Sequence, residues 1–337
     1  ALARDIEIPR AIANLRFFAH AATQFASESH HGEAGLNYTL RPPLGVIAAI
    51  SPWNLPLYLF TWKIAPALAA GNTVVAKPSE ITPASASLLA TLSGEIGLPP
   101  GVLNVVHGVG AEVGDALIDD PRVRAVSFTG STAVGRRIGA RTGAALKKAS
   151  LELGGKNATL VFADSDWEPQ LATLVRSAFQ NAGQICLAPD YLLLPEELLS
   201  DFVAEAVRFV SEMYPTLRNN PDYTSIINPR HFDRLRGYLA DAQAKGARLV
   251  EINPAQEDLS DREIRKIAPT LVLDTSDAMQ VLREEIFGPL LPIKTYRDFS
   301  AAIDYVNAQP RPLAAYYFGE DAGERQQMLE QTTSGAV

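Results

Sequence analysis

The 337-residue chain has a single cysteine, no excess of basic charge and no long uninterrupted apolar run. The lone cysteine, Cys186, excludes an internal disulfide framework and predicts a reducing compartment, the cytoplasm. A formal net charge of −8 at pH 7 argues against nucleic-acid binding, which requires a basic surface. The apolar stretch 55–70 is interrupted by Lys63 and Pro66, and a bilayer crossing needs about 18 apolar residues, so no membrane-spanning helix is predicted.

Metal ligation is not predicted either. His30, His31, His107 and His231 show none of the spacings typical of metal ligands, and Cys186 has no second cysteine to complete a zinc site. We interpret these histidines as structural or exposed residues.

The composition, with 47% hydrophobic and 20% charged residues, is typical of an α/β protein, and the length allows two domains. Apolar strand-like runs alternate with helical stretches, which predicts parallel sheets built from βαβ units. We place the domain boundary at Gly154-Gly155, giving domains 1–153 and 154–337. The predicted strands are 44–50, 73–76, 102–106, 125–128, 159–162 and 191–194. The predicted helices are 57–70, 83–96 (with Thr82 as N-cap), 111–118, 133–140, 167–182 and 196–213.

Cys186 ends the segment 179–186, where a helix is expected to stop. On composition alone a lone cysteine is more often a small buried apolar residue. Asn181, Gly183 and Gln184 favour a nucleophile, because they supply polar groups and allow the close backbone approach that supports a developing oxyanion. The segment therefore predicts a reactive thiol.

Glu152 lies in the segment 151–156, between Leu151 and Leu153 and before Gly154-Gly155. A glutamate in a strand is more often exposed or ion-paired, but these apolar neighbours suggest a desolvated carboxylate. Such a group is suited to act as a general base, so Glu152 and Cys186 together predict covalent thiol catalysis completed by a separate base.

Three further segments follow predicted strands. Asn54, on the proline-stiffened turn 51–56, is equally suited to stabilise an oxyanion or to satisfy its own backbone. Segment 77–80 begins with Lys77 and ends with Glu80, two charged residues that suit ribose hydroxyls, the alternative being a solvated loop. Segment 128–135 runs from a strand into a helix N-terminus, which favours pyrophosphate binding.

The order and spacing of these motifs resemble the aldehyde dehydrogenase superfamily over essentially the whole chain. The resemblance implies a Rossmann-type NAD(P)-binding domain followed by an α/β catalytic domain. It also implies that Cys186 forms a thiohemiacetal and then a thioester, that Glu152 activates water to hydrolyse the thioester, and that Asn54 is the side-chain half of the oxyanion hole.

The cofactor site is implied by the same resemblance. Glu80 should repel a 2′-phosphate, so NAD is the expected cofactor, with NADP still open. The implied cofactor-binding residues are Trp53 beside the phosphates, Lys77 and Glu80 at a ribose, Gly130 and Ser131 at the pyrophosphate, and Glu285 and Phe287 at the nicotinamide ribose and ring.

Within the superfamily, residues 1–187 resemble muconic semialdehyde dehydrogenases, and residues 188–337 resemble the class 3 group, particularly coniferyl aldehyde dehydrogenases. This difference suggests either a hybrid joined near Cys186 or one natural subfamily that mixes both features. The substrate is accordingly expected to be an aromatic aldehyde or a muconic-type semialdehyde. Arg10 is the candidate contact for a substrate carboxylate, the alternative being a surface residue at a helix start.

Members of the superfamily are typically longer at both ends. The chain is therefore expected to be a fragment with an incomplete substrate tunnel and a weakened assembly surface. The intact protein is expected to form a homo-oligomer, a dimer or a tetramer. A non-catalytic structural or binding protein on the same fold remains the alternative function.

Overall fold

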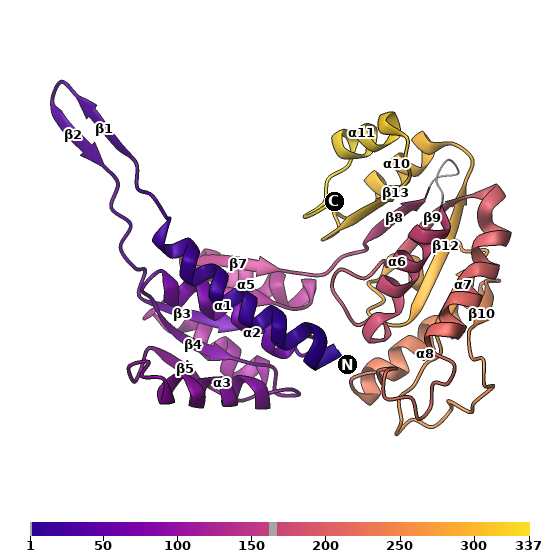
Figure 1. Cartoon of the computed structure of the whole chain (residues 1–337), viewed down its shortest axis with the longest axis horizontal. Coiled ribbons are helices and arrows are strands. Elements are labelled where there is room, and N and C mark those ends of the chain that lie inside the picture. Colours follow the sequence, from indigo (N-terminus) through magenta and orange to yellow (C-terminus); the bar gives the residue numbers. More distant parts are fainter. Residues whose placement is uncertain (1, 162–166) are drawn as a thin grey trace. The chain divides into compact units, whose positions relative to one another are not determined.

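The computed structural model describes residues 2–161 and 167–337, and the chain divides into two compact units, Ala1–Leu153 and Gly154–Val337 (Figure 1). Phe162, the last residue of one predicted strand, lies outside the described residues. Among the helices that the structure describes, none combines the length and the apolar character that crossing a bilayer requires.

The first unit is built on a parallel sheet with strand order β5-β4-β3-β6-β7. Its strands are β3 (Val46–Ile50), β4 (Thr73–Lys77), β5 (Leu103–Val105), β6 (Val123–Thr129) and β7 (Lys148–Glu152). Its helical segments are η1 (Ala3–Glu7), α1 (Ile8–Thr23), α2 (Pro56–Ala69), α3 (Ala84–Glu95), η2 (Gly110–Gly114), α4 (Asp115–Asp119) and α5 (Thr132–Ala144). Strands β1 (Ser29–Gly32) and β2 (Gly35–Tyr38) form a separate antiparallel pair whose side chains are exposed.

Strand β3 shows why this sheet is covered on both faces. Ala48 and Ile50 pack in one apolar cluster with residues of α4 and α5, whereas Ala49 packs in another with Phe60 and Ile64 of α2. A strand that is buried on both faces carries a continuous apolar sequence rather than an alternating one, as 46–50 does.

The second unit contains, within the described residues, a sheet with strand order β10-β11-β12-β9-β8-β13, parallel except for the antiparallel pair β10-β11. Its strands are β8 (Ala158–Val161), β9 (Tyr191–Pro195), β10 (Arg248–Glu251), β11 (Thr270–Leu273), β12 (Leu290–Tyr296) and β13 (Ala315–Phe318). Its helical segments are α6 (Trp167–Phe179), η3 (Gln180–Gly183), η4 (Glu196–Leu198), α7 (Leu199–Met213), α8 (Pro229–Ala244), α9 (Gln280–Arg283), α10 (Phe299–Ala308) and α11 (Ala322–Gln331).

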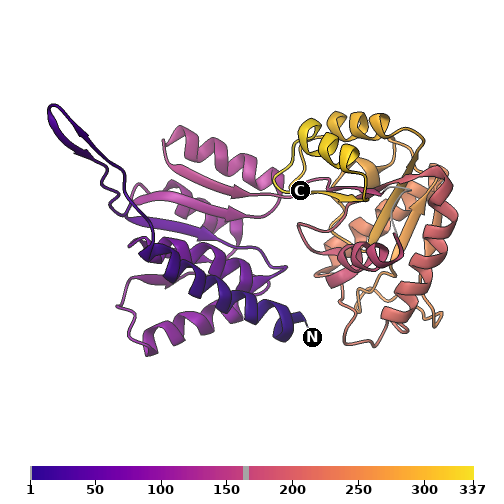
Figure 2. The same ribbon diagram turned by 45° about the horizontal axis from the view of Figure 1, so that its top comes forward.

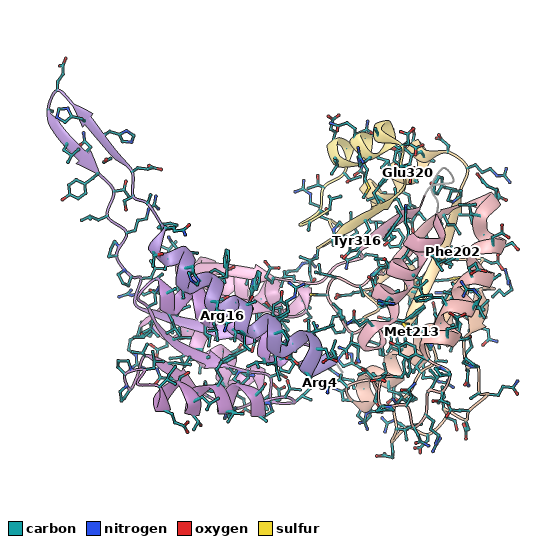
Figure 3. All side chains as sticks on the ribbon, viewed as in Figure 1. Arg4, Arg16, Phe202, Met213, Tyr316 and Glu320 are labelled. Carbon is teal, nitrogen blue, oxygen red and sulfur yellow. The ribbon has the colours of Figure 1, made fainter. Side chains whose placement is uncertain are left out.

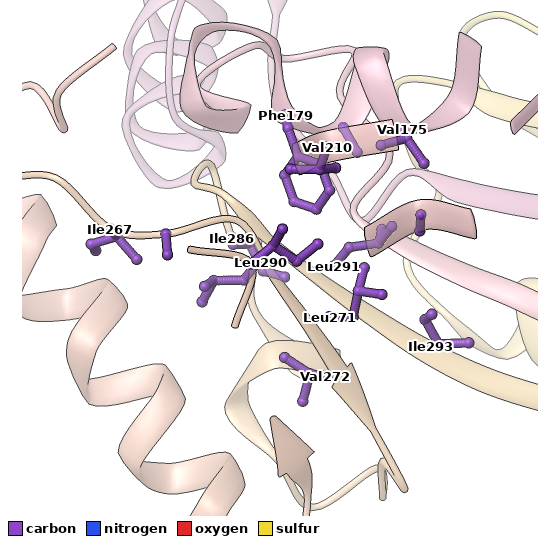
Figure 4. Close-up of a cluster of buried hydrophobic side chains, with 14 of the residues drawn as sticks. Val175, Phe179, Val210, Ile267, Leu271, Val272, Ile286, Leu290, Leu291 and Ile293 are labelled. Carbon is purple, nitrogen blue, oxygen red and sulfur yellow. The ribbon is translucent and has the colours of Figure 1, made fainter. Parts of the chain in front are cut away.

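Helices cover both faces of this second sheet as well (Figure 2). Leu192 and Leu194 of β9 belong to a large core with residues of α6, α7 and α8. The alternate residues, Tyr191 and Leu193, belong to a smaller core with residues of α10 and α11. Figure 4 shows part of the large core, where Phe179 and Val210 lie near the strand residues Leu271, Leu291 and Ile293.

Several predicted helix ends differ from the structure. The helix predicted over 167–182 ends at Phe179, because Asn181 and Ala182 have positive φ values of 54° and 51°. The helix predicted over 83–96 begins at Ala84, and Pro83 rather than Thr82 occupies the cap position. The helix predicted over 196–213 begins at Leu199 after the short turn η4.

Candidate functional site

The carboxyl ends of four neighbouring strands meet at one edge of the first unit's sheet. The register pairs Ile50 of β3 with both Lys77 of β4 and Phe128 of β6, and it pairs Thr129 with Glu152 of β7. This edge is where open α/β sheets bind ligands. At these strand ends, or in the turns that follow them, lie the residues predicted for the first unit's part of the site other than Arg10: Trp53, Asn54, Lys77, Glu80, Gly130, Ser131 and Glu152.

The turn that carries Asn54 is tied at both ends. The backbone N–H of Ser51 donates to the carbonyl of Lys77 at 3.1 Å, and the N–H of Leu57 donates to the buried carboxylate of Glu7 at 2.6 Å. Asn54 is buried and Trp53 is half-buried. The amide is thus held on a fixed turn, as an oxyanion donor requires.

Lys77 and Glu80 form a pair with unequal exposure. Lys77 is buried, and its Nζ donates to the carbonyl of Pro78 at 3.0 Å and to Oε2 of Glu80 at 3.3 Å. The Glu80 side chain is 47% exposed. Lys77 therefore fixes the position of a carboxylate that remains accessible to a ligand hydroxyl.

Gly130 and Ser131 immediately precede the helix α5. The N–H of Gly130 donates to the carbonyl of Glu152 at 3.1 Å, and a Cβ at position 130 would collide with the ring of Phe128. Ser131 is the N-cap of α5 and its hydroxyl accepts from the N–H of Val134 at 3.4 Å. A helix N-terminus and an accessible carboxylate at the same edge of the sheet fit a dinucleotide, because the former suits pyrophosphate and the latter suits a ribose hydroxyl.

Glu152 lies at the end of β7, but the expected burial of its side chain is wrong, because the side chain is exposed. Leu151 and Leu153 pack instead with the core on one face of the sheet. The alternation of side chains along a strand explains the difference, since two apolar residues on one face leave the residue between them on the other.

Lys63 of α2 is a residue of this edge that sequence analysis missed. Its side chain is buried, and its Nζ donates to Oγ1 of Thr129 at 2.5 Å. Burial lowers the pKa of Lys63 to about 8, although the nearby carboxylate of Glu152 raises it in part. The sequence signal for this residue is a single lysine inside an otherwise apolar helix.

In the second unit, Cys186 follows a left-handed turn. Asn181, Ala182 and Gly183 have φ values of 54°, 51° and 69°. Residues other than glycine adopt this conformation at a cost of about 1–2 kcal/mol each. At Gly183 a Cβ would also collide with the carbonyl oxygen of Gly288, so the turn lies directly against the loop that carries Glu285 and Phe287.

The buried side chain of Gln184 stabilises this turn. Its Nε2 donates to the carbonyls of Asn181 at 3.1 Å and Ser225 at 3.2 Å, and its Oε1 accepts from the N–H of Ile227 at 3.0 Å. The thiol of Cys186 that follows is half-buried. The polar residues of this segment led to the prediction of a reactive thiol, but nothing in the sequence predicted the left-handed turn before it.

Glu285 is held in place over Gly154. A Cβ on Gly154 would collide with the Glu285 carboxylate, which accepts a hydrogen bond from the N–H of Gly155. Burial raises the pKa of Glu285 to about 7, and the negative charge of Asp190 adds to the rise. Arg234 fixes the backbone of the same loop by donating to the carbonyls of Glu285 at 3.2 Å and Ile286 at 2.7 Å.

A buried ion pair that the sequence did not predict also supports this loop. Lys156 and Asp190 are both buried, with Nζ and Oδ2 2.5 Å apart. The second carboxylate oxygen of Asp190 accepts from the N–H of Ile286 at 2.9 Å. Asp190 therefore connects the chain just after Cys186 to the Glu285 loop.

Arg10, the candidate substrate contact, is exposed on the first turn of α1.

Comparisons with known proteins agree with this geometry. The whole chain, residues 1–337, matches the aldehyde dehydrogenase family. It is 51% identical to a coniferyl aldehyde dehydrogenase of Pseudomonas sp. (strain HR199 / DSM 7063) over 98% of this chain and 69% of that protein. It is 39% identical to a 2-aminomuconic semialdehyde dehydrogenase of Danio rerio over 99% of this chain and 70% of that protein.

The fold agrees as well. A crystal structure of a Mycobacterium tuberculosis aldehyde dehydrogenase complexed with NAD+ superimposes with a TM-score of 0.90 and 34% sequence identity. That match covers 99% of this chain and 69% of the other. The predicted fold class is confirmed, and the chain belongs to the aldehyde dehydrogenase family, the NAD(P)-dependent enzymes that the order of its motifs resembled.

Proposed function

We propose that this protein oxidises an aldehyde to a carboxylic acid through a covalent bond to Cys186. The observation that carries the proposal is the position of the only thiol in the chain, directly after a left-handed turn that Gln184 stabilises. Backbone held in a strained conformation by its surroundings is typical of functional sites.

The thiolate of Cys186 attacks the carbonyl carbon, so that a carbon–sulfur bond forms and the carbonyl oxygen becomes an oxyanion. The amide of Asn54 donates a hydrogen bond to that oxygen. Loss of a hydride from the same carbon leaves a thioester. Glu152 then accepts a proton from water, which attacks the thioester carbon and releases the acid and the Cys186 thiolate. The exposure of Glu152 suits a base that must meet water.

NAD(P), when bound, supplies the acceptor for the hydride. In the first unit Lys77 and Glu80 would hold a ribose, the α5 N-terminus with Gly130 and Ser131 would hold the pyrophosphate, and Trp53 would lie beside the phosphates. In the second unit Glu285 and Phe287 would hold the nicotinamide ribose and ring. We accordingly propose 1–153 as the NAD(P)-binding domain and 154–337 as the catalytic domain, and the carboxylate of Glu80 favours NAD over NADP.

The proposed substrate is an aromatic aldehyde. The 51% identity to a coniferyl aldehyde dehydrogenase supports it, while a muconic-type semialdehyde is the second candidate because of the 39% identity to a 2-aminomuconic semialdehyde dehydrogenase. One relative matches 98% of the chain, which supports a single natural subfamily over a hybrid joined near Cys186. A homo-oligomer, a cytoplasmic location and a role for Arg10 in recognising a substrate carboxylate also remain proposals.

The test is the absorbance of reduced cofactor at 340 nm, with NAD or NADP and with coniferaldehyde, benzaldehyde or a muconic-type semialdehyde as substrate. We expect turnover to be fastest with coniferaldehyde and NAD and to be lost in Cys186→Ser. Preference for the semialdehyde would contradict the proposed substrate. Cofactor binding without turnover of any aldehyde would favour the alternative, a non-catalytic protein on this fold.

A further inference from the structure

Three consecutive backbone carbonyls, beginning with that of Cys186 itself, each accept a hydrogen bond from a side chain. Nδ2 of Asn157 donates to the carbonyl of Cys186 at 2.8 Å and to that of Ala188 at 3.0 Å. The hydroxyl of Tyr316 donates to the carbonyl between them, that of Leu187, at 2.6 Å. We call these three hydrogen bonds the carbonyl clamp.

The two clamping side chains belong to a fixed frame. Asn157 is buried immediately before β8. Tyr316, which is labelled in Figure 3, lies on the neighbouring strand β13, and the strand register pairs it with Thr159 of β8. Oδ1 of Asn157 accepts from the N–H of Ala314 at 2.9 Å, which ties the amide to the chain just before β13. The register of two parallel strands therefore sets where both donors lie.

The carbonyl clamp affects the ionisation of the thiol through the partial charges of the three carbonyl oxygens. A carbonyl oxygen carries partial negative charge, which opposes the formation of a thiolate close to it. A donor on each oxygen offsets part of that charge, and it also prevents the segment from relaxing away from the strained turn 181–183.

We propose that Tyr316 and Asn157 are positioning residues that hold the Cys186 segment so that its thiol ionises readily. This inference rests on the role proposed for Cys186 as the nucleophile. Tyr316 remains a hydrogen-bond donor over the working pH range, since burial raises its pKa and the neighbouring Cys186 raises it further.

The test uses the fact that Cys186 is the only cysteine, so alkylation by iodoacetamide reports on this position alone. Tyr316→Phe removes one hydroxyl and keeps the ring. Tyr317→Phe is the matched control, because the hydroxyl of Tyr317 donates at 2.9 Å to the carbonyl of Asp321. The rate constant of alkylation is measured from pH 5.5 to 9.5, and circular dichroism confirms that each variant is folded.

In Tyr316→Phe we expect the pH midpoint of alkylation to rise and the rate constant at pH 7 to fall about two- to tenfold, the ratio that corresponds to one hydrogen bond. Tyr317→Phe should match the wild type. Asn157→Asp, which keeps the acceptor for Ala314 but loses both donors, should shift the midpoint in the same direction. Loosened packing alone would change the high-pH plateau without moving the midpoint, so an unmoved midpoint in Tyr316→Phe would overturn the proposal.

Aldehyde oxidation by the same proteins separates this inference from the proposed function. A shifted midpoint in a protein whose wild type oxidises no aldehyde would support the clamp and refute the function. An unshifted midpoint in a protein whose wild type oxidises aldehydes would refute the clamp and leave the function supported.

Discussion

The affinity of the protein for its cofactor should depend on the ionisation of Glu285. Burial raises the pKa of this carboxyl to about 7, with Asp190 adding to the rise and the Gly155 N–H, Arg234 and Lys156 opposing it. A carboxyl that holds ribose hydroxyls does so best as a carboxylate, which accepts stronger hydrogen bonds than the neutral acid. Cofactor binding should therefore strengthen as the pH rises through about 7.

The size of the effect follows from the titration. An acid with a pKa of 7 is about one-tenth ionised at pH 6 and about nine-tenths ionised at pH 8. A hydrogen bond to a charged group contributes about 1.5–3 kcal/mol and one between neutral groups about 0.5–1.5 kcal/mol, so the neutral acid binds the ribose about five- to tenfold more weakly than the carboxylate. The association constant should accordingly rise about three- to fivefold between pH 6 and pH 8.

Titration of NADH fluorescence with protein at pH 6, 7 and 8 measures this constant. Glu285→Gln cannot titrate and should bind more weakly than the wild type at pH 8, with little change over the range. Glu284→Gln, at the exposed neighbouring position, should keep the full pH dependence. A wild-type affinity that is constant across the range would refute the reasoning, as would an unchanged pH dependence in Glu285→Gln.

Three other changes test the described contacts. Burial lowers the pKa of Lys63 to about 8, so the positive charge near Glu152, the proposed base, is lost as the pH rises through that value. The pH profile of kcat should therefore show a step near pH 8 that Lys63→Met lacks, and the same step in both proteins would exclude an influence of Lys63 on the base. Gly183→Ala adds a Cβ at a residue with φ 69°, against the carbonyl oxygen of Gly288, and should lower the free energy of unfolding in urea by about 2 kcal/mol or more. Gly237→Ala is the control, because a Cβ there points into open space on α8 and should leave the stability unchanged or raise it. Lys156→Met leaves Asp190 buried without its partner and should lower the free energy of unfolding by about 3–5 kcal/mol. Adding Asp190→Asn should recover part of this loss, because the asparagine still accepts the hydrogen bond from the N–H of Ile286. A double variant no more stable than Lys156→Met would contradict the assignment of a buried ion pair.

The first unit's part of the site could be predicted because its signals are local. Strands β3, β4 and β6 are short and largely apolar, and the turn that follows each strand contains polar residues or glycine. In a parallel sheet the carboxyl ends of the strands share one edge, so sequence order alone predicts that segments 51–54, 77–80 and 129–131 meet. The exposure of Glu152 was mispredicted because its apolar neighbours on both sides suggested burial, while strand periodicity separates their faces.

The contacts that support Cys186 were not predictable in this way. Tyr316 and Leu187 are separated by 129 residues, and Asn157 and Ala314 by 157. No local pattern marks either partner, because an asparagine before a strand or a tyrosine on one is common. The predicted end of the helix 167–182 is wrong for a related reason. Alanine has the highest helix propensity of all residue types, but the surrounding structure holds Ala182 in a left-handed conformation.

In the turn before Cys186, hydrogen bonds offset the energetic cost of the left-handed conformation. Two non-glycine residues in the left-handed conformation cost about 2–4 kcal/mol together. The three hydrogen bonds of the buried Gln184 contribute about 1–1.5 kcal/mol each at most, which is of the same size. Little stability is left over to hold the residues after the turn, so the conformation of Cys186 depends on the carbonyl clamp from Asn157 and Tyr316. Loss of either donor should therefore affect the reactivity of the thiol before it affects the stability of the fold.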